Sequence, residues 1–267
     1  QDVAVSGARP SDYRRDIEWF LRGSTPRELL DGFPTGWRQL DELHRARPGE
    51  VTLIRPAAHD DKEPRSAAAA RQIRLDRWAA RWLAFEQASR LACNLPEWSF
   101  RLVFDSGTRE RHFCGLQEFA ADVSWIFEHF SIEVVPPGDR VSRCLAFETV
   151  SGMPRGVTVF RHGLPGAPRE SGDDANSVLR IARRTGVHVC VVEDAAHDPE
   201  VEDHLLRVCD NCLTVRAWHD EQSEAGVDPR VHSVEVRVVK ARLRAPGGRH
   251  YGVLRPAEAP RLQPGKG

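Results

Sequence analysis

Residues 32–64 read GFPTGWRQLDELHRARPGEVTLIRPAAHDDKEP. Three apolar residues recur at the spacing of a short amphipathic helix or turn: Trp37, Leu40 and Leu43. The Pro48-Gly49 turn then leads into the apolar run Val51–Ile54, which predicts a buried strand, and a loop follows. This order predicts the first repeating unit of an α/β protein.

The layout resembles the start of the RecA-type motor core in the DnaB and Twinkle family of replicative hexameric helicases. The shared pattern is TG…LD…L…PGE before the first strand. The resemblance spans roughly residues 32–256, is strong at both ends, and is weak between about residues 96 and 155. It implies a RecA-like (P-loop NTPase-type) α/β sandwich: a mostly parallel twisted sheet with helices on both faces and antiparallel strands at its C-terminal edge.

The loop after the strand departs from that family. The family carries a glycine-rich loop, G-x-x-x-x-G-K-[ST], whose backbone N–H groups surround the phosphates and whose hydroxyl holds Mg²⁺. Here Lys62 falls at the lysine position, but Asp61 replaces the preceding glycine and Glu63 the hydroxyl residue. With Asp60 these acids would repel a triphosphate, and Pro56 removes a backbone donor. We expect a motor core that has lost its nucleotide site; the alternative is an ordinary surface loop and an accidental resemblance.

Other positions to which the resemblance assigns catalytic roles are also altered. Asp105 follows the predicted strand 99–104, where the family has a water-activating glutamate, and this shorter carboxylate is expected to contribute little. The predicted strand 156–160 ends with Phe160 and Arg161 in place of the aspartate that orients Mg²⁺. The predicted strand 186–192 is followed by Glu193-Asp194, where the family carries a polar γ-phosphate sensor. We therefore expect no catalytic residue and no bound cofactor; ATP and Mg²⁺ belong only to the alternative of an active motor.

Two groups of basic residues are candidates for contact with a nucleic acid or a partner. A helix predicted over 66–93 has an apolar stripe (Leu75, Trp78, Trp82 and Phe85) flanked by Arg71, Arg74, Arg77 and Arg81. This side of the helix is either a core stripe beside a solvated basic face or a docking surface for RNA, DNA or an acidic partner. Lys240-Ala241-Arg242 fits the family's K-x-R, which reaches the neighbouring subunit's nucleotide. With Arg244, these residues are either a remnant of that function or ordinary basic residues on a hairpin.

Cysteine use argues against a secreted protein. Six cysteines are scattered through 267 residues, as in a reduced intracellular chain. Cys209 and Cys212 have C-x-x-C spacing with His204 and His219 nearby, but no second pair exists, so structural cysteines are favoured over zinc. The sequence contains no run of eighteen apolar residues, so it predicts no membrane span. The 38 Lys and Arg residues balance the 39 Asp and Glu residues, so any contact with nucleic acid must be local.

Three segments are predicted: a helical lead-in over 1–31, a degenerate RecA-like core over 32–256 and a tail over 257–267. The chain begins at Gln1, which suggests a processed N-terminus. We expect a pseudo-ATPase that serves as a structural or recruiting subunit of a larger nucleoprotein assembly. The Twinkle-like resemblance suggests the mitochondrial matrix, in a ribosome, an assembly intermediate or an RNA-processing particle. Its partners are then protein subunits, with RNA or DNA left open. The alternatives are an ATP-dependent DNA helicase or DNA-repair ATPase, and a zinc-bound or hydrolytic enzyme.

Overall fold

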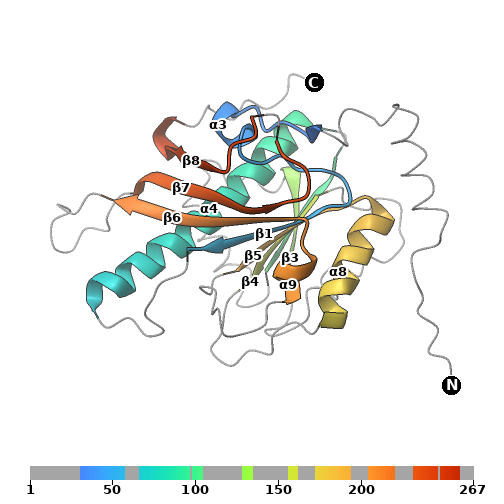
Figure 1. Cartoon of the computed structure of the whole chain (residues 1–267). Coiled ribbons are helices and arrows are strands. Elements are labelled where there is room, and N and C mark those ends of the chain that lie inside the picture. Colours follow the sequence, from blue (N-terminus) through green and yellow to red (C-terminus); the bar gives the residue numbers. More distant parts are fainter. Residues whose placement is uncertain are drawn as a thin grey trace.

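The strands of the computed structural model form one mixed sheet in the order β3-β2-β4-β5-β1-β6-β7-β8 (Figure 1). The described residues are 31–57, 66–96, 98–104, 128–134, 156–161, 172–193, 204–219, 231–245 and 247–258. Within them the strands are β1 (Val51–Pro56), β2 (Phe100–Phe104), β3 (Phe130–Val134), β4 (Gly156–Arg161), β5 (His188–Glu193), β6 (Asn211–His219), β7 (Val231–Ala241) and β8 (Tyr251–Leu254). All neighbours from β3 to β6 are parallel, whereas β7 and β8 are antiparallel. The predicted α/β sheet with antiparallel C-terminal strands is confirmed.

Helices lie on both faces of the sheet, as predicted (Figure 1). The described helices are α3 (Arg38–Asp41), α4 (Ala67–Asn94), α8 (Gly172–Thr185), α9 (His204–Val208) and the 3₁₀ turn η1 (Pro256–Glu258). One apolar core packs α4 and Trp37 against the sheet, and a second core packs α8 and α9 against the other face of β1, β4 and β5. Because β1 is covered on both sides, all six of its residues are buried.

The TG…LD part of the sequence pattern builds the turn before α3. The Asp41 carboxylate accepts hydrogen bonds from Thr35 N (2.7 Å), Thr35 Oγ1 (2.8 Å) and Gly36 N (3.2 Å). Gly36 has a φ of 77°, which glycine adopts without strain. These residues hold the chain that enters the first strand, so this part of the resemblance reflects folding.

Helix α4 begins one residue after the predicted start, because Ser66 is its N-cap and accepts a hydrogen bond from Ala69 N at 3.1 Å. The helix is fixed to β6 by a buried carboxylate. Asp76 Oδ1 accepts from Ala217 N and from Gln72 Nε2, both at 2.7 Å, and Gln72 Nε2 also donates to Ala217 O at 2.8 Å. Ala217 lies beyond the last residue of β6 that pairs with β1, so α4 supplies the hydrogen bonds that the neighbouring strand does not.

One expected element boundary was wrong. Phe130 was predicted to end a helix, but it begins β3, where its ring lies 6.1 Å from the rings of Phe85 and Phe100. The strand predicted over 132–135 therefore starts two residues earlier. The remaining boundaries shift by a few residues, and the helix predicted over 177–184 extends over Gly172–Thr185.

Several predictions fall on residues outside the described ranges. These include the lead-in over 1–30, the helix over 119–127, the strand over 144–150, the hairpin loop over 221–229 and the end of the tail. In the part of the chain that the structure describes, no helix is long and apolar enough to cross a membrane.

Candidate functional site

The carboxyl ends of the parallel strands are the edge where ligands bind in sheets of this class. Arg55 of β1 and Glu193 of β5 meet there: Arg55 NH2 lies 3.1 Å from Glu193 Oε2. The Arg55 side chain is 3% exposed and that of Glu193 21%. Glu193 was predicted to repel phosphate as a bare acid at the sensor position. It instead forms an ion pair within the chain, because β5 lies directly beside β1.

The next strands bring aromatic rings to the same end of the sheet. Phe104 closes β2 and Phe160 lies one residue before the end of β4, and their rings stack at 4.9 Å between centroids with an angle of 10°. Cζ of Arg81 lies 5.9 Å from the Phe160 ring centroid. The expectation that Phe160 and Arg161 end this strand is confirmed. Within their described residues, β2 and β4 contain no carboxylate.

Two positions to which the resemblance assigns a nucleotide role fall outside the described part of the chain. Lys62 and Asp105 lie outside the described residues, since the chain is described up to Ala57 after β1 and up to Phe104 in β2. The described part of the edge therefore includes the Arg55–Glu193 ion pair and the Phe104–Phe160 stack with Arg81 over the Phe160 ring.

Lys240, Arg242 and Arg244 lie at the opposite end of the sheet. Strand β7 runs antiparallel to β6, and Ala241 pairs with Asn211, which in turn pairs with Thr52 near the start of β1. From Thr52 to Pro56 the strand rises about 13 Å, so these side chains cannot reach their own carboxyl edge. A role with nucleotide would have to be at a neighbouring subunit's site.

The three basic residues make contacts within their own chain. Lys240 Nζ donates to the carbonyl oxygens of Leu206 (3.1 Å) and Arg207 (2.9 Å), near the end of α9. Arg242 NH1 lies 3.6 Å from Asp210 Oδ1, and the Arg242 side chain is half exposed. The side chain of Arg244 is exposed, while its carbonyl oxygen accepts from Arg47 NH2 at 3.2 Å.

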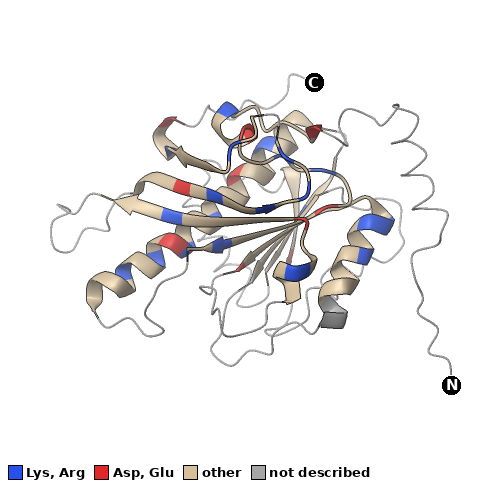
Figure 2. Ribbon diagram, viewed as in Figure 1, with Lys and Arg blue, Asp and Glu red and all other residues tan. Residues whose placement is uncertain are grey.

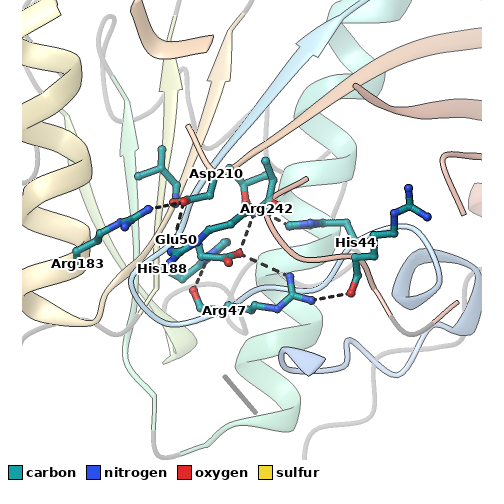
Figure 3. Close-up of polar contacts among 11 residues, drawn as sticks. His44, Arg47, Glu50, Arg183, His188, Asp210 and Arg242 are labelled. Atoms are coloured by element: carbon teal, nitrogen blue, oxygen red, sulfur yellow. Dashed lines mark hydrogen bonds and ion pairs between the residues drawn. The ribbon is translucent and has the colours of Figure 1, made fainter. Parts of the chain in front are cut away.

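Sequence reasoning missed a buried polar cluster at the amino ends of β1, β5 and β6 (Figure 3). We call it the polar cluster; its members are His44, Arg47, Glu50, Arg183, His188, Asp210, Asn211 and Arg242. Asp210 is its centre: Oδ2 accepts from Val51 N at 3.0 Å, and Oδ1 accepts from Arg183 NH2 at 2.7 Å and faces Arg242. One carboxylate thus links β1, α8 and the end of β7.

Glu50 and two histidines complete the cluster. Glu50 Oε2 accepts from Asn211 Nδ2 at 2.9 Å and lies 3.6 Å from Arg47 NH1; burial raises the pKa of Glu50. His44 Nε2 bonds Thr52 Oγ1 at 3.3 Å, and His188 Nδ1 donates to Arg47 O at 3.2 Å. Burial lowers the pKa of His188 to about 4 and holds that of His44 well below its ordinary value.

This geometry is that of a structural network. Its members bind the starts of three adjacent strands to each other and to α8, and the two acids have cation or amide partners. Two sequence features could have predicted the polar cluster: Glu50 in the PGE pattern and the Asp210-Asn211 pair at the start of β6. In the sequence alone, each is an isolated polar site. Their partners lie about 160 positions away in the chain.

The C-x-x-C residues lie in the core. Cys209 and Cys212 are each 1% exposed and pack in the cluster beneath α8 and α9, and Cys209 Sγ contacts Leu206 O at 3.4 Å. Among the described residues, no group of three or more His, Cys, Asp or Glu side chains is placed to hold a metal ion. Structural packing accounts for both thiols.

The arginine-flanked stripe on α4 belongs to the core. Trp82 and Phe85 are buried, and Leu75 and Trp78 pack against the same cluster. Arg71 and Arg74 are exposed, whereas Arg77 and Arg81 are half-buried. The core alternative for the aromatic residues is therefore correct, and a docking surface on this face would offer guanidinium groups without those rings.

Comparisons with known proteins support the fold alone. No protein-family model matches the sequence, and no curated protein does. Among solved structures, the chain is similar to the flagellar accessory protein FlaH from Methanocaldococcus jannaschii, with a TM-score of 0.51 and 8% sequence identity. The similarity covers 85% of this chain and 94% of that one. With the strand order and helices on both faces, this likeness shows that the chain has a RecA-like α/β fold.

Proposed function

We propose that this protein is a RecA-like domain that neither binds nor hydrolyses nucleoside triphosphates and serves as a structural or recruiting subunit of a nucleoprotein assembly. The observation that carries the proposal is the Arg55–Glu193 ion pair at the carboxyl ends of β1 and β5. The sequence supports it, since residues 55–63 contain no glycine and three acids. A DnaB- or Twinkle-type ancestry and a mitochondrial setting belong to the same proposal.

The ion pair opposes phosphate binding for an electrostatic reason. A triphosphate at this edge would approach Glu193 or would have to take Arg55 away from it. Taking Arg55 away would leave the Glu193 carboxylate beside the bound phosphates, and these like charges repel each other, which lowers the affinity for a triphosphate. The aromatic stack on the adjacent strands offers no oxygen ligand for Mg²⁺ to offset it.

Calorimetric titration with ATP and Mg²⁺ tests the proposal. We expect no binding heat and no shift of the melting temperature at millimolar ATP. Lys62→Ala is the matched variant, because Lys62 stands at the position of the phosphate lysine. Micromolar binding that Lys62→Ala abolishes would reject the proposal in favour of an ATP-dependent helicase or repair ATPase.

A further inference from the structure

The sheet has a face over β6, β7 and β8 that no described helix covers. The apolar core beneath α8 and α9 includes Cys212 of β6 but no side chain of β7 or β8. On the opposite side, α4 and α3 pack against Val215, Val234, Val236 and Leu254. Because neighbours across antiparallel strands point to the same side, the residues between these positions share the other side. We call this the open face: Thr214, Arg216, Trp218, Ser233, Glu235, Arg237, Tyr251 and Val253.

The open face exposes aromatic surface. Tyr251 is 51% exposed and Trp218 47%, although most side chains of this size are buried. In the part of the chain that the structure describes, the exposed large hydrophobic side chains all lie between Trp218 and Val253. Such a local concentration marks a contact surface.

The open face also carries more positive than negative charge. By the strand register its cations are Arg216 and Arg237, and its one acid is Glu235. Figure 2 shows Lys and Arg on β6 and β7, and by sequence the acid of these two strands is Glu235. Glu235 lies on the open face between Arg216 and Val253, but it is buried there and accepts from Trp218 Nε1 at 3.2 Å and from Arg237 Nε at 2.7 Å. The exposed groups are therefore rings and guanidinium groups.

Ring and charge also lie side by side. Arg237 pairs across the strands with Tyr251, its side chain is 65% exposed, and its Cζ lies 5.9 Å from the Tyr251 ring centroid. Trp218 of β6 pairs with Ser233 of β7, and Tyr251 of β8 pairs with Arg237, four residues further along β7. The two aromatic residues are therefore about 16 Å apart. One planar ligand cannot touch both rings, so the face suits an extended ligand with repeated planar groups and negative charges.

We propose that the open face binds single-stranded nucleic acid, with bases stacking on Tyr251 and Trp218 and phosphates contacting Arg216 and Arg237. Unpaired bases present flat faces to aromatic side chains, and the backbone supplies the anions. A duplex hides its base faces from a sheet surface. The proposal rests on the scaffold role above and deepens it by naming the class of partner.

Fluorescence anisotropy with a labelled twenty-residue oligouridine, across a series of NaCl concentrations, tests the site. Tyr251→Ala and Trp218→Ala should each weaken binding about 5- to 100-fold, whereas Tyr251→Phe and Trp218→Phe keep the ring and should bind nearly as well as the parent. Arg237→Gln should lower the slope of log K against log salt by about 0.7. Arg38→Gln is the matched charge control, since Arg38 is 89% exposed on α3, on the other side of the sheet. It should leave both affinity and slope unchanged.

Several outcomes would overturn the proposal: no binding of oligouridine by the parent protein at low salt, equal binding of a duplex, or equal losses in Arg38→Gln and Arg237→Gln. Unchanged affinity in both alanine variants, with melting curves like that of the parent, would assign the face to a protein partner instead. These results are independent of the ATP titration. A chain that binds neither ligand keeps the scaffold proposal and loses this one.

Discussion

The two ends of the parallel strands differ in the polar groups that they bury. At the amino ends, eight side chains from distant parts of the chain form the polar cluster around Asp210 and Glu50. At the carboxyl ends of β1, β5, β2 and β4, where this fold binds ligands, the described residues form the Arg55–Glu193 ion pair and the Phe104–Phe160 stack, with Arg81 over the Phe160 ring. The end where ligands bind in this fold has the simpler polar contacts, and the opposite end contains the network. The motif residues Asp41 and Glu50 make the structural contacts, so the resemblance to a motor family is a resemblance of the scaffold.

If the polar cluster holds the amino ends together, replacing its central residue Asp210 with Ala should cause the largest loss of stability. The change leaves Val51 N without its acceptor and Arg183 without its carboxylate. A buried N–H left without an acceptor and a lost hydrogen bond to a charged group each cost about 1–3 kcal/mol, and we expect a loss of about 4 kcal/mol in the free energy of unfolding by urea denaturation. Arg38→Ala, which breaks an exposed i,i+4 pair with Glu42, should have a much smaller effect on stability. Similar losses in both variants would mean that the polar cluster does not hold the strands together.

The sequence predicted the sheet but not these networks, and the reason is physical. Apolar runs such as Val51–Ile54 and the alternation of Val234, Val236 and Val238 depend on local periodicity, so the strands were correctly placed. The position of Glu193 at a strand end was also correct. Its partner Arg55 was not predicted, because the pair forms only when β5 lies beside β1, and strand order is set by the packing of the whole sheet. Phe130 was misassigned because an apolar residue at the end of a helical pattern fits a following strand equally well.

At the carboxyl edge, the two halves of the ion pair should differ in cost. Glu193→Ala leaves the Arg55 guanidinium, 3% exposed, without its carboxylate, and we expect a loss of about 3 kcal/mol. Arg55→Ala leaves a glutamate that is 21% exposed and can regain water. The broken ion pair should therefore lower the free energy of unfolding less in Arg55→Ala than in Glu193→Ala. Urea denaturation of the single variants and of the double variant Arg55→Met with Glu193→Leu measures this difference.

The double variant sharpens the comparison between the two ends. Apolar replacement of both partners of a buried pair is often neutral in stability, and we expect the double variant to lie within about 1 kcal/mol of the parent. If it is instead less stable than Glu193→Ala alone, the pair contributes to the fold through other contacts. In that case, polar contacts at the carboxyl ends stabilise the fold as those at the amino ends do, and the two ends differ less than their geometry indicates.

A pH dependence located at the amino ends should be smaller than the losses from Asp210→Ala and Glu193→Ala. The pKa of His188 is about 4 in the folded protein against an ordinary value of 6.5, so the unfolded chain binds a proton that the folded chain does not between these pH values. Stability from this group is therefore full above pH 6.5 and lost as the pH falls toward 4. For His188 alone the loss between pH 7 and pH 5 is about 2 kcal/mol, and His44, whose pKa is also lowered, adds to it. Glu50 acts in the opposite sense, since its raised pKa contributes stability at low pH that is lost as the pH rises through that value.

Urea denaturation at several pH values measures this dependence. The slope of the free energy of unfolding against pH should be smaller in His188→Gln and steeper in Glu50→Gln. A parent protein equally stable at pH 7 and pH 5, with His188→Gln following the same flat line, would mean that water reaches the ring and that the cluster is not buried in solution.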